Sequence, residues 1–144
     1  MSILKKPQLG QSLIEVLTAL AVVLLVIIAL IRATTTSMKG SDFAKTQSSA
    51  TSYGQEAIEW IRAERDKDWN NIYVHATGAP LCLMSLEWTS AECGENDYID
   101  GTKFKRQAIL TNDGEKVKIE VIVGWQDSSG EHQSKLTTYL TNWR

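Results

Sequence analysis

Acidic side chains gather along residues 56–68, and their number and spacing raise the question of catalysis. Paired carboxylates can act as general acid and general base when their environments separate their pKa values. Here the acids alternate with basic residues at three-residue steps, such as Glu59 and Arg62, which is typical of a solvated helix face. The sequence contains no serine-hydrolase elbow, no glycine-rich phosphate loop and no zinc-protease motif. We therefore expect no catalytic residues and no enzymatic activity.

Metal binding is the second kind of chemistry that these side chains could support. A zinc site would need cysteines and histidines at short spacing, and the only histidines, His75 and His132, do not provide it. The aspartates of the predicted loops lack the spacing of an EF-hand and are better explained by turn chemistry: Asp97, Asp100, Asp113 and Asp127. We expect neither a metal nor a cofactor.

Cys82 and Cys93 are the only two cysteines, and ten residues separate them. A disulfide that closes such a loop would contribute about 3 kcal/mol to stability in the chain-entropy model. Two free thiols, or half of a metal site, are the alternatives. We favour the disulfide, because both residues lie in the part of the chain that we place outside the membrane, where disulfides persist.

Glu15 is the one charged residue in a long apolar stretch that covers residues 11–31. From residue 13 onward, every side chain of this stretch is apolar except Glu15 and Thr18. These 19 residues would form a helix of about 28 Å, close to the hydrocarbon thickness of a bilayer. A carboxylate inside a membrane span is expensive, so Glu15 is a candidate functional residue. The alternative is that Glu15 lies at the membrane interface without a role.

The residues before the apolar stretch are few, polar and basic. They read MSILKKPQLG, with Lys5 and Lys6 and no acid. This excess of positive charge predicts a cytoplasmic amino end and an exported carboxy-terminal part. No small-residue cleavage site follows the apolar stretch, which argues against an ordinary secretory signal.

Gly10, followed by Gln-Ser-Leu-Ile-Glu-Val and the apolar run, closely resembles the prepilin signature of type IV pilins and type II secretion pseudopilins. The resemblance implies that a prepilin peptidase cleaves between Gly10 and Gln11, and that the new amino terminus of Gln11 is N-methylated. Glu15 becomes the fifth residue of the mature chain, as in that family, which implies a role in filament assembly. The family usually has phenylalanine at the first mature position, and Gln11 departs from this pattern.

The same resemblance implies a structural role, as a subunit of a type IV pilus or a type II secretion-like filament, and we favour a minor subunit. The implied partners are other pilin-like subunits, prepilin peptidase, the inner-membrane assembly platform and membrane lipid. The implied location is the bacterial cytoplasmic membrane, in single-pass topology, and then a cell-surface or periplasmic filament.

Two alternative functions stay open from the sequence. One is an unprocessed single-span membrane protein with an exported binding domain, and the other is a DNA-uptake pseudopilin. The formal net charge is −2 and no basic patch stands out in the exported part, so we expect no nucleic-acid partner.

Hydrophobic periodicity predicts an α+β fold, in which a long N-terminal helix packs on a C-terminal antiparallel β-meander of three or four strands. Strands are predicted at residues 104–111, 117–125 and 133–143, with turns at 112–114 and 127–130. One stripe of the helix should cover the sheet: Tyr53, Ala57, Ile58, Ile61 and Ala63. The chain then divides into a leader (1–10), a transmembrane and assembly helix (11–31), its exported continuation (32–66), a connecting loop with both cysteines (67–103) and the sheet (104–144).

Overall fold

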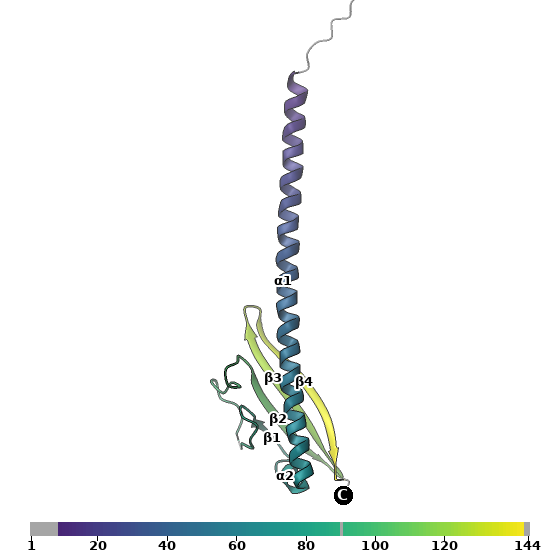
Figure 1. The fold of residues 1–144 in the computed structure, drawn as a ribbon, viewed down its shortest axis with the longest axis vertical. Helices are drawn as coiled ribbons and strands as arrows, with labels where there is room; N and C mark the ends of the chain where they lie inside the picture. Colours follow the sequence, from purple (N-terminus) through teal and green to yellow (C-terminus); the bar gives the residue numbers. More distant parts are fainter. Residues whose placement is uncertain (1–8, 90, 143–144) are drawn as a thin grey trace, which may run out of the picture. The chain divides into compact units, whose positions relative to one another are not determined.

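The computed structural model describes residues 9–89 and 91–142, with side chains from residue 13 onward (Figure 1). The chain divides into two compact units, the first ending at Phe43 and the second beginning at Ala44. The elements in chain order are α1 (Leu9–Lys67), α2 (Trp69–Tyr73), β1 (Thr77–Cys82), β2 (Lys105–Asp113), β3 (Lys116–Asp127) and β4 (Gly130–Thr141).

Within the described residues, the first unit is the N-terminal part of helix α1. The helix contains no proline, so none of its backbone donors is missing. Gly40 makes no close packing contact, because a Cβ added there would meet no atom within 4 Å. The helical state predicted for residues 11–31 and 32–66 is confirmed, and α1 ends one residue later, at Lys67.

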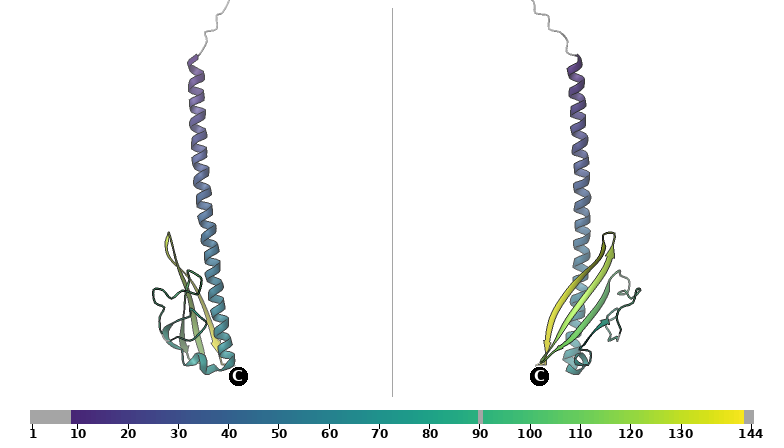
Figure 2. Two further views of the ribbon diagram at one scale, coloured as in Figure 1. Left: turned by 60° about the vertical axis from the view of Figure 1, so that its left-hand side comes forward. Right: turned by 180° about the vertical axis from the view of Figure 1, so that it is seen from behind.

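In the second unit, four strands form one antiparallel sheet in the order β1-β2-β3-β4. Each strand pairs with the next along the chain, so the sheet is a meander. The β3–β4 pairing runs without a break from Lys116 opposite Thr141 to Asp127 opposite Gly130. The part of α1 that belongs to this unit, residues 44–67, lies across one face of the sheet (Figure 2). The predicted α+β fold is confirmed, with four strands.

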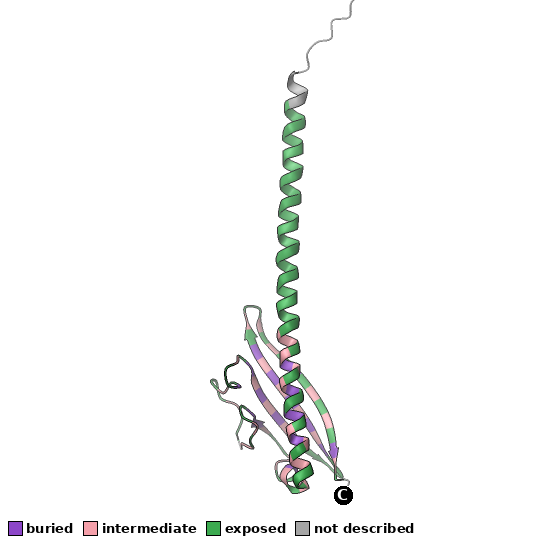
Figure 3. Ribbon diagram, viewed as in Figure 1, coloured by how far each residue is buried: buried purple, intermediate pink, exposed green. Residues whose placement is uncertain are grey.

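The hydrophobic core lies between this helix segment and the inner face of the sheet (Figure 3). Alternate residues of β3 are buried while those between them are partly exposed, which is the period of two that a pleated strand imposes. The buried β3 residues are Val117, Ile119, Val121, Val123 and Trp125. The helix contributes Ala50, Ala57, Ile58 and Ile61.

The buried stripe of α1 is shifted toward the amino end relative to the prediction. Ala63 is exposed, whereas Ala50 and Gly54 are buried. Ala63 lies two positions from Ile61, and a two-residue step turns about 200° around a helix axis. Gly54 allows close contact with β4, because an added Cβ would lie 2.6 Å from Leu136 Cδ1.

The connection between α1 and the predicted sheet was expected to be a loop over residues 67–103, and this expectation is wrong for its first part. Helix α2 and strand β1 both lie within it. Strand β1 contains Gly78 and Pro80 and carries an irregularity in its pairing with β2 between Thr77 and Pro80. Such a strand has little propensity of its own and exists at the edge of the sheet because β2 offers it hydrogen bonds.

Tight two-residue loops join the last three strands. The β2–β3 loop is Gly114-Glu115, since Asp113 pairs with Lys116, and Gly114 has φ +69°. The turn predicted at 112–114 therefore begins two residues later and ends one residue later, because β2 continues to Asp113. The β3–β4 loop is Ser128-Ser129, as predicted, and the Ser129 backbone N–H donates to Asp127 Oδ1 at 2.7 Å.

Candidate functional site

The apolar part of helix α1 is the first candidate functional region. Among the described residues, α1 is the one helix long and apolar enough to cross a membrane, and none of its most apolar window is buried. The large aliphatic side chains of residues 13–31 are 45% to 66% exposed. A stretch this apolar needs a cover of lipid or protein, because in water it would expose far more contiguous apolar surface than soluble proteins do.

Glu15 lies near the beginning of this apolar stretch, with its side chain exposed. Within the described part of the chain, its carboxylate has no hydrogen-bond or ion-pair partner. The neighbouring hydroxyl of Thr18 donates to the Glu15 carbonyl oxygen at 2.9 Å, so Thr18 satisfies its donor within the helix. Glu15 is therefore the polar group of this stretch that still needs a partner in an apolar environment.

Three consecutive threonines follow the apolar stretch and behave as Thr18 does. The hydroxyls of Thr34, Thr35 and Thr36 donate to carbonyl oxygens three or four positions earlier, at 2.8–3.1 Å. Arg32, just before them, is the first basic residue after the apolar stretch. Helical threonines can satisfy their hydroxyls in this way without water, so the region around 32–36 suits the boundary between lipid and solvent.

Gly10 and Gln11, the predicted cleavage and methylation residues, lie in the first turn of α1 by their backbone. The side chain of Gln11, like those of Lys5 and Lys6, lies outside the described residues. In sequence, Gln11 and Glu15 are four positions apart, the spacing at which residues share one face of a helix. Neither belongs to the unit that carries the disulfide.

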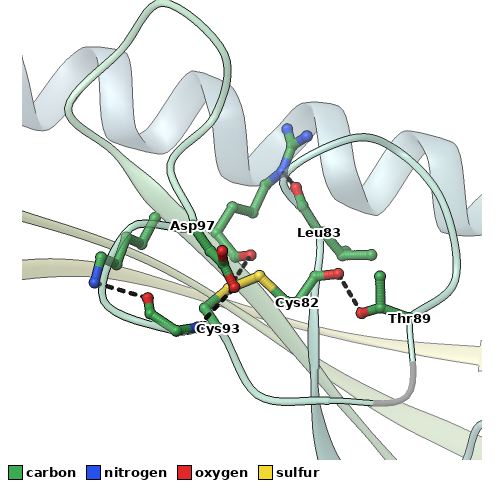
Figure 4. Close-up of a disulfide and its surroundings, with 8 residues drawn as sticks. Cys82, Leu83, Thr89, Cys93 and Asp97 are labelled. Carbon is green, nitrogen blue, oxygen red and sulfur yellow. Dashed lines mark hydrogen bonds between the residues drawn. A yellow bond between two sulfur atoms is a disulfide. The ribbon is translucent and has the colours of Figure 1, made fainter.

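Cys82 and Cys93 form a disulfide, as predicted (Figure 4). Their Cα atoms are 4.8 Å apart. Cys82 ends β1, and the segment to Cys93 folds back along it: the Cys82 backbone N–H donates to the Ala91 carbonyl oxygen at 2.8 Å, and the Thr89 hydroxyl donates to the Cys82 carbonyl oxygen at 2.6 Å. The loop thus contacts β1 at its last residue, Cys82, and the disulfide fixes the start of the segment that leads to β2.

Arg106 is a buried cation that no sequence motif marks. Its side chain is only 2% exposed. Its Nε donates to the Leu83 carbonyl oxygen at 2.9 Å, and its Nη1 donates to the Tyr53 carbonyl oxygen at 3.0 Å and to Glu56 Oε2 at 2.6 Å. In β2, Arg106 falls on the same face as Ala108 and Leu110. This alternation is the sequence signal that would have predicted a buried Arg106.

Two carboxylates of the sheet, Glu120 and Asp127, have charged or hydrogen-bonding partners. The Lys135 and Lys118 ammonium groups lie 2.6 Å and 3.3 Å from the Glu120 carboxylate, and their hydrogen bonds lower the pKa of Glu120. At the β3–β4 loop, the hydrogen bond from the Ser129 backbone, with a further one from His132, lowers the pKa of Asp127. These pairs stabilise the sheet near neutral pH and do not resemble a reactive site.

Both histidines have structural contacts. His75 stacks on Trp88 with ring centroids 4.2 Å apart and donates from Nδ1 to the Asn71 carbonyl oxygen at 2.7 Å. His132 stacks on Trp125 and lies 3.0 Å from Asp127. In the described part of the chain, no group of three or more histidine, cysteine or acidic residues is placed to hold a metal ion.

The described residues thus contain two candidate functional features: an exposed apolar helix segment in which Glu15 has no described partner, and a domain closed by a disulfide. Comparison with known proteins found no matching family model, no similar curated protein and no similar solved structure.

Proposed function

We propose that this chain is a structural subunit, of the minor class, of a type IV pilus or type II secretion-like filament. The observation that carries the proposal is the exposed apolar segment of α1, near whose start Glu15 has no partner among the described residues. The prepilin-like residues around Gly10 give the same segment a processing signal. The proposed role is assembly and not catalysis.

Cleavage after Gly10 would create a positive amine on Gln11, and methylation would keep that charge. An isolated ammonium and an isolated carboxylate are each costly in an apolar setting, and a close pair recovers much of that cost. We propose that the Glu15 carboxylate pairs with the Gln11 amine of an adjacent subunit. Since the aliphatic side chains around Glu15 offer no competing donor, this pair sets the register between neighbouring helices.

Association then moves the apolar helices from lipid into a bundle of similar helices. Lipid contacts are exchanged for helix packing, so apolar burial alone gives little preference for one register. A contact between the amino end of one subunit and Glu15 of the next joins two different surfaces, which makes it head-to-tail and produces an open filament. Other pilin-like chains with the same pair of groups fit the same arrangement.

The proposed location follows from the two ends of the chain. Lys5 and Lys6 favour a cytoplasmic amino end at the bacterial cytoplasmic membrane, which leaves the second unit exported. The Cys82–Cys93 disulfide supports this orientation, since disulfides persist outside the reducing cytosol. Prepilin peptidase, the inner-membrane assembly platform and membrane lipid are the partners that this route requires.

N-terminal processing provides the direct test. The full chain would be co-expressed with an active prepilin peptidase, and the intact mass of the membrane form would be measured. We expect loss of residues 1–10 and a methylated Gln11 terminus, and we expect a Gly10→Val variant to keep Met1. An intact Met1 terminus in the wild type would contradict the proposal and favour a single-span anchor with an exported binding domain.

A further inference from the structure

We propose that the outer face of the sheet, the face turned away from α1, carries a binding site for a short neutral saccharide. This site lies wholly in the second unit and does not depend on filament assembly. A cavity of about 510 Å³ opens on this face beside the disulfide-closed loop, within the size range of small-molecule sites.

A glycine on the outer face of β3 leaves part of the cavity open. Gly124 lies between Lys105 on β2 and Gln133 on β4 in the sheet register. A Cβ at Gly124 would meet no atom closer than the His132 carbonyl oxygen, at 3.8 Å. Since the φ of Gly124 is not positive, backbone conformation does not require glycine here, and the missing side chain serves to leave space.

Polar side chains with unused hydrogen-bonding capacity surround this space. Gln107, Gln126, Gln133 and Glu131 line the cavity, and none of them has a side-chain hydrogen bond or ion pair to any described residue. Three amides supply donors and acceptors together, and the carboxylate supplies acceptors. A ligand with many hydroxyl groups, each both donor and acceptor, matches this set.

One side of the cavity is formed by the aromatic ring of Tyr98, which contacts Lys105. Tyr98 lines the cavity and is 43% exposed. The Lys105 ammonium lies 5.0 Å from the centre of the Tyr98 ring and donates to the Gly94 carbonyl oxygen at 3.0 Å, so the loop next to Cys93 is tied to β2. An amphipathic ring beside amide groups suits a sugar, which presents apolar C–H surfaces between its hydroxyls.

Charge argues for a neutral ligand over an anion. Lys103 and Lys105 bring positive charge to the lining, but Glu131 brings a negative one, and the Lys105 ammonium already has an acceptor and a ring to contact. An anion would therefore meet one repelling carboxylate and two cations, of which Lys105 is already engaged and Lys103 lies close enough to Asp127 to help lower its pKa. A neutral saccharide gains hydrogen bonds without that penalty.

The test uses the full ¹⁵N-labelled chain in phosphocholine micelles, whose headgroup contains no sugar. Oligomers of glucose, galactose, mannose and N-acetylglucosamine, and separately inorganic phosphate, would be titrated while backbone and glutamine side-chain amide signals are recorded. We expect at least one saccharide to shift the signals of Gln126 and Gln133, with a Kd at or below about 1 mM.

Two variants and one control locate the site. Gly124→Leu fills the cavity and Gln126→Ala removes an exposed amide, and each should weaken binding at least tenfold. Thr137→Leu changes the same outer face of β4 outside the lining and should leave binding unchanged. Absence of any saccharide response, a response to phosphate alone, or saccharide binding that survives both Gly124→Leu and Gln126→Ala would overturn the proposal.

Discussion

Arg106 Nη1 on β2 lies 2.6 Å from Glu56 Oε2 on α1, fifty positions away in the sequence. The two partners are unequal, because the Arg106 side chain is 2% exposed and the Glu56 side chain is 52% exposed. Arg106 also donates to the carbonyl oxygens of Tyr53 and Leu83, so one guanidinium joins the helix, β2 and the residue after β1. A rigid planar donor group is suited to such a junction.

Arg106→Met should therefore destabilise the second unit by about 1–3 kcal/mol, since the Leu83 carbonyl oxygen would lose its donor while staying buried. Glu56→Gln should cost less than about 1 kcal/mol, because the half-exposed carboxylate is solvated when unpaired. Urea unfolding of the full chain can be followed by tryptophan fluorescence, as all five tryptophans lie after residue 43. Lys116→Met is the control, and equal losses for Lys116→Met and Arg106→Met would contradict the assigned role.

Gly54 lies where α1 packs closely against Leu136 of β4. Gly54→Ala adds helix propensity of up to about 1 kcal/mol, but the new Cβ would approach Leu136 Cδ1 to 2.6 Å. That atom is the end of the Leu136 side chain, which can shift at part of the usual overpacking cost of about 1–3 kcal/mol, so we expect Gly54→Ala to gain less stability than Gly40→Ala. Gly40→Ala is the matched control, because nothing lies within 4 Å of its Cβ position, and it should stabilise the helix.

A double-mutant cycle tests whether Leu136 causes the difference between the two glycine variants. If Leu136 is the residue displaced, Leu136→Ala should destabilise less in the Gly54→Ala background than in the wild type. Strictly additive effects would show that the Gly54 position is sensitive for another reason.

The Cys82–Cys93 disulfide should stabilise the second unit by about 3 kcal/mol, as expected for a loop of this length in the chain-entropy model. The Cys82→Ala/Cys93→Ala variant should unfold at a lower urea concentration than the oxidised wild type. Reduced wild type should unfold at the same urea concentration as the double variant. That result would show that the lost stability comes from the covalent link and not from the removal of the sulfur atoms. Quantitative thiol labelling of the native, unreduced protein would contradict the prediction.

The ion pairs of Lys135 and Lys118 with Glu120 should make the second unit less stable at acidic pH than at neutral pH. Because their hydrogen bonds hold the pKa of Glu120 below its ordinary value in the folded state, ionised Glu120 stabilises the fold above the ordinary carboxyl pKa. That contribution is lost as the pH falls through the lowered pKa. The Tm of Glu120→Gln should thus be below that of wild type at neutral pH, and the difference should vanish in acid.

The control for this pH dependence is Glu115→Gln, at an exposed loop residue with no ion pair to any described residue. Its Tm should follow the wild-type curve across the same pH range. A difference between wild type and Glu120→Gln that is constant with pH would exclude the ion pairs as its source.

Glu15→Ala should impair assembly without affecting processing or the fold of the second unit. If Glu15 pairs with the amine of an adjacent subunit, its removal leaves that amine uncompensated, which typically costs about 3–5 kcal/mol in a buried setting. The measurement is the amount of protein in sheared or co-purified filaments at equal membrane levels. Glu95→Ala, at an exposed acid of the second unit, is the control, and equal incorporation of both variants would show that Glu15 does not set the register.

The sequence by itself determined the features that arise within one element. The length and apolarity of residues 13–31 define a candidate membrane helix, and the alternation from Val117 to Trp125 defines a strand with one buried face, because local periodicity reports which side of an element avoids water. The number, short separation and inferred compartment of Cys82 and Cys93 were sufficient to predict their disulfide. The role of Glu15 stays a prediction, since its proposed partner belongs to another molecule.

Only the tertiary structure decided the features that need two distant segments. Strand β1 forms because β2 supplies its hydrogen bonds, and a segment with Gly78 and Pro80 carries no strand signal of its own. The partners of Arg106, the contact of Gly54 with Leu136 and the cavity over Gly124 all depend on how the helix, strands and disulfide loop meet. The periodicity of a sequence predicts whether a side chain faces the core or the solvent. It does not predict which distant residue that side chain contacts, because long-range packing determines the contact.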